Sequence, residues 1–131
     1  MSYYFAKTLA LGFDEAVQHT MEALKREGFG IITEIDVKEI FKKKLDVDFR
    51  RYRILGACNP TLAHEALQIE DKVGTMLPCN VVVQDVGGGR SEIAAIDPVA
   101  SMQAIDNPDL KAAAERVRVK LCRVIESLQC S

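Results

Sequence analysis

A glycine-bearing segment decides the fold, and its sequence is Cys79-Asn-Val-Val-Val-Gln-Asp-Val-Gly-Gly-Gly-Arg-Ser-Glu-Ile-Ala-Ala-Ile96. Its two ends, residues 79–86 and 91–96, are rich in residues that favour β-strands. The three glycines at positions 87–89 lie between them, and glycine adopts the positive φ angles of tight hairpin turns without steric cost. We therefore predict that the two runs pair as a β-hairpin.

Three more runs of β-forming residues precede the hairpin, and they predict strands over residues 3–9, 29–35 and 49–58. Apolar residues at helical spacing separate these strands and follow the hairpin. The predicted helices, each with the residue that caps it, are 13–27 after Gly12, 37–45 after Asp36, 60–71 after Asn59, a short stretch after Asp97 and a last helix after Asn107. Residues 72–77 are predicted to form a connecting loop.

The order of elements is therefore β-α-β-α-β-α-β-β-α. A hairpin together with strands separated by helices indicates the α+β class, with a mostly antiparallel sheet and helices packed on one face. The last helix carries a core stripe of Leu110, Ala113, Ala114, Val117, Leu121, Val124 and Leu128. Because no linker, repeat or low-complexity tract interrupts the pattern, residues 1–131 are predicted to form a single domain.

Composition narrows the class of protein. The chain has 131 residues, 48% hydrophobic and 27% charged, with a formal net charge of −2, and this whole-molecule charge argues against nucleic acid as a partner. No apolar run approaches the roughly 20 residues of a membrane span. The segment 1–12 lacks the layout of a signal peptide. We expect a cytoplasmic protein without a membrane partner, whose four cysteines are reduced thiols.

Three segments together resemble the domain-of-unknown-function 302 (DUF302) family, a set of mostly bacterial and archaeal proteins. They are Gly28-Phe-Gly-Ile-Ile-Thr-Glu-Ile-Asp36, Tyr52-Arg-Ile-Leu-Gly-Ala-Cys-Asn-Pro60 and Leu77-Pro-Cys-Asn-Val-Val-Val83. The resemblance extends from about Tyr3 to the last helix. It implies a compact fold similar to the TATA-binding-protein-like class and a homodimer, and it implies no established activity.

Cys58 and Cys79 are the first candidates for chemistry. Cys58 directly precedes the Asn59-Pro60 helix start, and the positive end of a helix lowers the pKa of a nearby thiol. Cys79 begins the next strand after Pro78, so adjoining strand ends would bring both sulfurs to one site. Such a pair suits Cu(I) or Zn(II), or a reversible disulfide. The alternative is that both cysteines are small buried residues that fill the interface between sheet and helices.

Glu34 is the candidate among the carboxylates. Asp36, Glu39 and Asp97 lie nearby or at the end of the last strand, and helix capping explains them. Glu34 has no such structural role in the sequence, so we predict that it takes part in ligand binding. The basic residues between Lys38 and Arg53 are interrupted by acidic ones, and this pattern is typical of a solvated surface rather than a phosphate or RNA site.

These residues leave three functions open, and neither a reaction nor a ligand is specified. The first is a dimeric binding or regulatory module with a pocket near Cys58 and Cys79 that holds a small molecule or a soft metal, with Asn59 and Glu34 in the same site. The second is a thiol-dependent redox enzyme that uses the two cysteines. The third is an interaction protein whose cysteines are purely structural. We expect the first, because the most specific motifs centre on the cysteines and no complete catalytic set is present.

Overall fold

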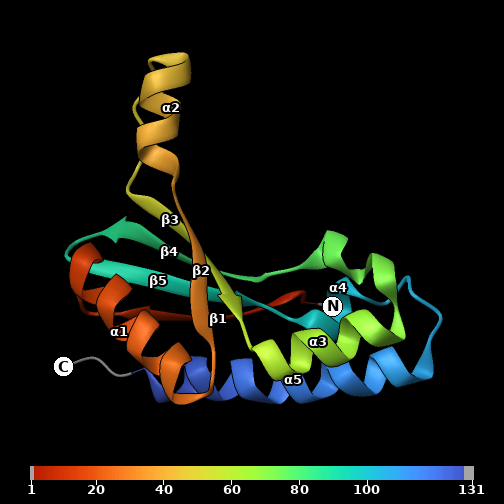
Figure 1. Ribbon diagram of the computed structural model, residues 1–131. Helices are drawn as coiled ribbons and strands as arrows, with labels where there is room; N and C mark the ends of the chain where they lie inside the picture. Colours follow the sequence, from red (N-terminus) through yellow and green to blue (C-terminus); the bar gives the residue numbers. More distant parts are fainter. Residues whose placement is uncertain (1, 129–131) are drawn as a thin grey trace.

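One five-stranded antiparallel sheet organises the protein, with strand order β1-β5-β4-β3-β2 (Figure 1). A computed structural model describes residues 2–128. The strands are β1 Tyr4–Leu9, β2 Gly30–Asp36, β3 Tyr52–Cys58, β4 Cys79–Gly87 and β5 Arg90–Ile96. The helices are α1 Phe13–Arg26, α2 Val37–Leu45, α3 Pro60–Ile69, the 3₁₀ helix η1 Asp71–Met76, α4 Pro98–Ser101 and α5 Pro108–Ser127. The α+β class, the order of elements and the hairpin are confirmed.

Helices α1 and α5 cover one face of the sheet (Figure 1). Alternate residues of the central strands point toward them, and Leu55, Val81 and Ile93 are fully buried there. The predicted stripe of α5 supplies the opposite side of this core, with Leu121 and Val124 also fully buried. No helix of the described part of the chain, residues 2–128, has the length and apolar character needed to cross a membrane.

Side-chain caps start four of the helices, as the sequence predicts. Asp36 accepts a hydrogen bond from the Glu39 amide, and Asn59 accepts one from the Leu62 amide. Asp97 and Asn107 cap α4 and α5 in the same way. Each of these side-chain oxygens satisfies an amide that the first helical turn leaves without a partner.

The largest differences from the prediction lie in two regions, while other element ends shift by one or two residues. Strand β3 begins at Tyr52 rather than at residue 49, because the Phe49 ring turns away to pack against Phe41 of α2, with ring centroids 5.2 Å apart. Residues 71–76 form η1 instead of a loop. Val73 is fully buried in this segment, and its burial stabilises a helical turn that the polar neighbours do not indicate.

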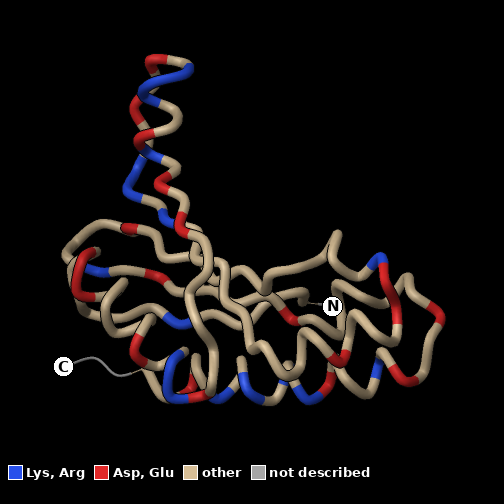
Figure 2. Tube along the Cα trace, in the orientation of Figure 1, with Lys and Arg blue, Asp and Glu red and all other residues tan. Residues whose placement is uncertain are grey.

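Helix α2 projects from the rest of the protein as an arm carried by the ends of β2 and β3 (Figure 1). None of its nine residues is buried. Most charges on α2 are positive, and acidic residues lie at its start and just after its end (Figure 2). Two of its lysines form ion pairs, Lys42 with Asp46 at 2.9 Å and Lys43 with Glu39 at 2.7 Å. The basic residues of the helix therefore lie on a solvated surface that is partly neutralised by neighbouring carboxylates.

Candidate functional site

An apolar cavity of about 330 Å³ lies where the end of β3 and the start of β4 meet α3, η1 and α5. Its walls come from segments that are far apart in the chain. The lining residues are Phe29, Ile32, Ala57, Cys58, Asn59, Leu62, Ala63, Ala66, Leu67, Gly74, Leu77, Pro78, Cys79, Pro98, Met102, Ala113, Ala114 and Val117. None of them carries a charged side chain.

The cavity forms where two hydrophobic clusters adjoin. The main cluster, between the sheet and helices α1 and α5, contributes Ala57 and Cys79 to the walls. A second cluster beneath α3 and η1 contributes Ala66, Met102 and Ala114. Because alanine fills so little volume, its repeated use at this boundary leaves space that leucine or phenylalanine would occupy.

A β-bulge in β2 places Ile32 at the cavity. Ile31 pairs with Ala57 and Thr33 pairs with Gly56, so Ile32 is the extra residue between them. Its side chain lines the cavity although it is 60% exposed, which puts it at the boundary with solvent. Bulges redirect side chains in this way and are frequent beside binding sites. Ile32 was not among the predicted site residues, since nothing in the β-forming run 29–35 marks the bulge.

The two predicted cysteines lie together at this cavity. Cys79 pairs with Ala57 across the β3–β4 ladder, so Cys58 and Cys79 lie on adjacent strands one residue apart in register, and both line the space. Both thiols are free. Burial, and secondly electrostatic interaction with Cys58, raises the pKa of Cys79 to about 11. Cys79 is therefore a neutral thiol at pH 7.

Asn59 supplies the amide group in the lining. Its Oδ1 accepts the hydrogen bond from the Leu62 amide at 3.2 Å and so starts α3. Its Nδ2 lies on the side of Gly28, where an added Cβ would be only 3.1 Å from that nitrogen. Asn59 thus has a structural role in α3 and a position at the cavity.

Glu34 lies apart from the cavity. Its carboxylate pairs with the Arg53 guanidinium at 3.2 Å, on the neighbouring strand, and Glu34 is not one of the lining residues. The ion pair gives it the structural role that the sequence did not reveal.

Among residues 2–128 no group of three or more His, Cys, Asp or Glu side chains is arranged to hold a metal ion.

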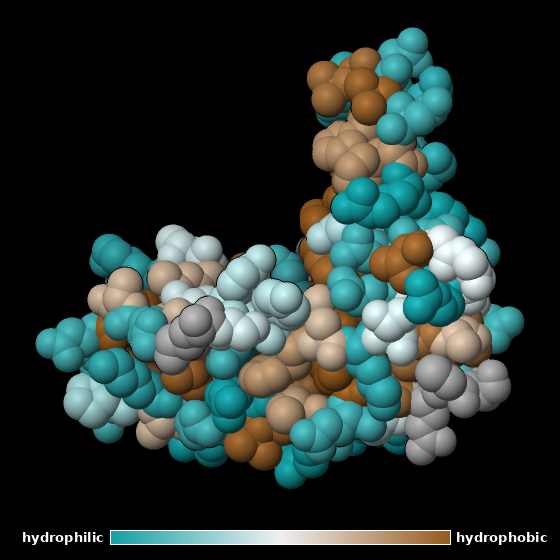
Figure 3. Space-filling model, turned by 180° about the vertical axis from the view of Figure 1, so that it is seen from behind, coloured by the Kyte–Doolittle hydropathy of each residue, from teal (hydrophilic) through white to brown (hydrophobic). Residues whose placement is uncertain are grey.

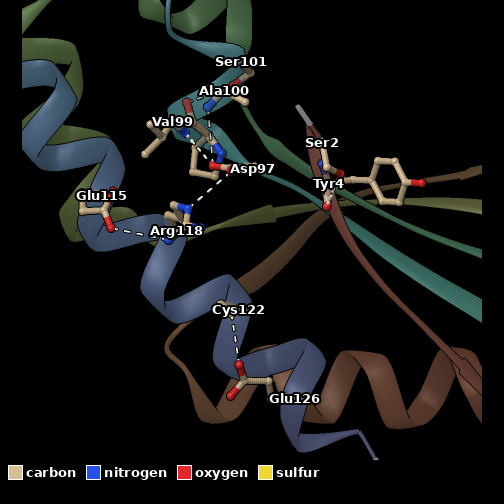
Figure 4. Close-up of polar contacts among 11 residues, drawn as sticks. Ser2, Tyr4, Asp97, Val99, Ala100, Ser101, Glu115, Arg118, Cys122 and Glu126 are labelled. Carbon is tan, nitrogen blue, oxygen red and sulfur yellow. Dashed lines mark hydrogen bonds and ion pairs between the residues drawn. The ribbon is translucent and has the colours of Figure 1, made fainter.

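A third thiol, Cys122, lies on the outer part of α5. Figure 4 shows its side chain directed along the helix toward Glu126, to which the thiol donates a hydrogen bond at 3.3 Å. Partial burial and then this carboxylate raise the pKa of Cys122. One turn earlier, Arg118 reaches from α5 to the buried Asp97 at 3.3 Å (Figure 4). Cys130, the remaining cysteine of the sequence, lies outside the described residues.

Fold and site together define a small α+β protein with an uncharged cavity at the ends of two central strands. The chain belongs to the family described as domain of unknown function DUF302, whose sequence model matches residues 5–128. The predicted family is thus confirmed. The likeness to the TATA-binding-protein-like class, the cytoplasmic location and the single-domain organisation stay predictions.

A crystal structure of an uncharacterised DUF302 protein from Bacillus stearothermophilus is similar to this chain over nearly its whole length. The two share 28% sequence identity with a TM-score of 0.88, and the match covers 96% of this chain and 98% of the other. The comparison with curated proteins gave no match. The similarities therefore establish the family and the fold, and the function has to be argued from the site.

Proposed function

We propose that this protein is a binding module that holds a small organic molecule in the cavity beside Cys58 and Cys79. The observation that carries this proposal is the cavity itself, whose volume of about 330 Å³ lies at the small end of the roughly 300–1,000 Å³ range of ligand sites. Such sites are mostly apolar with a few polar groups that orient the ligand. Here Asn59 and the two thiols are those groups.

The thiols favour this proposal over the redox and metal alternatives. A thiol reacts or binds metal as its thiolate, and burial holds the pKa of Cys79 at about 11, so Cys79 is protonated at neutral pH. Cys58 is half-buried and lines the cavity, so a molecule bound there would cover its thiol. The rate at which Cys58 is alkylated therefore reports whether the cavity is filled.

The test uses the neutral fluorescent probe N-phenyl-1-naphthylamine on a protein in which Cys122 and Cys130 are replaced by serine. We expect the probe to slow alkylation of Cys58 by iodoacetamide at least tenfold at saturation. Ala63→Leu, on the cavity wall, is expected to weaken probe binding at least tenfold, because the added side chain occupies the ligand volume. Ala112→Leu, at an exposed position on α5, is the matched control and is expected to bind normally.

The same experiment separates the alternatives. Equal binding by Ala63→Leu and Ala112→Leu would place the probe elsewhere and end the proposal. Fast alkylation that only Cu(I) suppresses, with loss of the metal in both Cys58→Ser and Cys79→Ser, would favour a soft-metal site instead. A Cys58–Cys79 disulfide that forms reversibly under mild oxidants would favour the redox enzyme.

We further propose that the partner of this protein is a second copy, held through the α2 arm. A nine-residue helix is shorter than the roughly 12–15 residues at which isolated helices become even marginally stable, so packing against a partner would stabilise it. Ile40, Leu45 and Val47 of the arm region are 40–65% exposed. Figure 3 shows apolar surface on the side of the arm that overlooks the body.

The body offers a matching surface on the face of the sheet that α1 and α5 leave open. A shallow groove of about 360 Å³ crosses it, lined by Tyr4, Tyr52, Val82 and Ile96 and also by the polar residues Asn80, Gln84 and Glu92. In a twofold dimer each arm would lie on the open face of the other copy, since a symmetric interface uses the same two surfaces twice. Burial of the apolar parts of both surfaces would drive the association.

We expect light scattering to give twice the monomer mass of 14.5 kDa. The double variant Ile40→Lys/Leu45→Lys is expected to shift the protein to the monomer, because two charges would have to be buried without partners. Val119→Lys, at a similarly exposed valine on α5, is the control and should remain dimeric. A wild-type protein that stays monomeric at concentrations up to 100 μM would refute the dimer.

A further inference from the structure

The chemical class of the ligand follows from the cavity wall, on the basis of the binding function proposed above. We infer that the cavity takes an uncharged, mainly apolar molecule that carries a hydrogen-bond acceptor, such as a ketone, ester or amide oxygen, directed at Nδ2 of Asn59. The inference rests on the absence of charge in the described lining and on the hydrogen-bonding state of this one amide.

The wall offers nothing to a charged ligand. Its described side chains include no Asp, Glu, Lys, Arg or His, and Cys79 is protonated at neutral pH because burial raises its pKa to about 11. An ionised group that moved into this space would lose its water and find no counter-charge, which costs far more than a hydrogen bond returns. The ligand is therefore neutral in the bound state.

Asn59 determines the polar part of the ligand. Helix α3 fixes the orientation of the amide, since its oxygen is the group that accepts from the Leu62 amide. The nitrogen is then the free end, and across residues 2–128 no acceptor is hydrogen-bonded to it. Asn59 is half-buried at the edge of the cavity, so a ligand oxygen near Nδ2 would gain a hydrogen bond from this nitrogen, whereas a ligand donor would face another donor.

Experiment can test whether a carbonyl group in the ligand strengthens or weakens binding. An acetyl group is more costly to remove from water than the slightly smaller ethyl group, so the ketone binds more weakly than the hydrocarbon in a wholly apolar cavity. The order reverses only when the carbonyl finds a donor inside. Three probes of nearly equal shape measure this, namely 2-acetylnaphthalene, 2-ethylnaphthalene and 2-naphthoate.

Isothermal titration calorimetry of the full-length protein at pH 7 is the measurement. We expect 2-acetylnaphthalene to bind about 3- to 10-fold more tightly than 2-ethylnaphthalene, in line with the net value of one hydrogen bond. We expect 2-naphthoate to bind at least about 30-fold more weakly than the ketone. Asn59→Asp keeps the capping oxygen and the side-chain shape but removes the donor. In this variant the ketone is expected to bind more weakly than 2-ethylnaphthalene, whose own affinity changes little and so reports an intact cavity.

The outcomes separate this inference from the proposed function. Tight binding of 2-naphthoate, or a ketone preference that survives Asn59→Asp, would overturn the ligand class while Ala63→Leu still abolished binding at the cavity. No binding of any probe, or binding of all three unaltered by Ala63→Leu, would overturn the binding function and the ligand class with it. The expected order of affinities in the wild type, with its reversal in Asn59→Asp, supports both.

Discussion

Gly56→Ala is expected to lower the free energy of unfolding by about 1 to 3 kcal/mol, the usual range for forcing extra atoms into a filled space. A Cβ at this position would lie 2.0 Å from Oγ1 of Thr33 and 2.8 Å from Cγ of Pro78. The threonine can rotate away, but the proline ring is rigid and belongs to the cavity wall. Urea denaturation followed by circular dichroism measures the change.

Gly30→Ala is the matched control for this prediction. Gly30 also lies in a strand, and an added Cβ would meet only the Cys58 carbonyl oxygen at 4.0 Å, an ordinary contact. Its stability should stay within about 0.5 kcal/mol of the wild type. Adding Thr33→Ala to Gly56→Ala should recover part of the loss. Equal stability of the Gly56→Ala and Gly30→Ala variants would show that the contact of Gly56 with Pro78 does not constrain the fold.

Between pH 9 and pH 11 the wild-type protein is expected to lose about 2 to 3 kcal/mol of unfolding free energy through Cys79 alone. Burial raises the pKa of this thiol from 9.0 to about 11 in the folded protein. Below pH 9 the thiol is protonated in both the folded and the unfolded state, so its contribution to the free energy of unfolding is complete. As pH rises further, the unfolded chain releases the proton first and is favoured, until the folded protein also ionises near pH 11.

The difference between two pH profiles isolates this contribution from other groups that titrate in alkali. Urea denaturation is measured from pH 8 to pH 11 for the wild type and for Cys79→Ala, which cannot ionise. We expect the stability of the variant to fall less steeply. Cys122→Ala removes a more exposed thiol whose pKa is also raised, and because solvent screens this thiol, its effect on the slope should be smaller than that of Cys79→Ala. Parallel profiles for the wild type and Cys79→Ala would contradict the buried, neutral state of this cysteine.

Both predictions concern the wall of the cavity, where packing and binding depend on the same residues. Pro78 and Cys79 begin the segment that enters β4 and face the space that the ligand would fill. A bound neutral molecule would add contacts between the two hydrophobic clusters and raise the stability of the folded state by mass action. The thermal stability of Gly56→Ala should therefore respond less to 2-acetylnaphthalene than that of Gly30→Ala.

Local sequence determined the elements of this protein because their causes are local. The three glycines at positions 87–89, all at positive φ in the structure, specify the hairpin through backbone sterics alone. The caps Asp36, Asn59, Asp97 and Asn107 bond to amides two or three residues away, so their chemistry is visible in the sequence. The stripe of α5 follows from the helical period and needs no knowledge of what it packs against.

The structure brings three of the four predicted site residues to one cavity. Cys58, Asn59 and Cys79 line one cavity because the antiparallel register sets Ala57 opposite Cys79, and the order of elements already indicated that these strand ends could adjoin. Glu34 was expected in the same site, yet its partner is Arg53 of the next strand. A single sequence cannot show this pairing, because the register of β2 depends on a bulge at Ile32.

The sequence by itself thus determined the class of fold and the helix starts set by caps, and it indicated that Cys58 and Cys79 could lie close together. Only the tertiary structure decided the rest: the bulge that brings Ile32 to the cavity, the 3₁₀ helix around Val73 and the projecting arm of α2. The physical reason is that a cavity is a property of packing. Its volume depends on the space that alanines from β3, α3 and α5 leave between the two hydrophobic clusters. The order of residues in the chain does not indicate how far apart these two clusters lie.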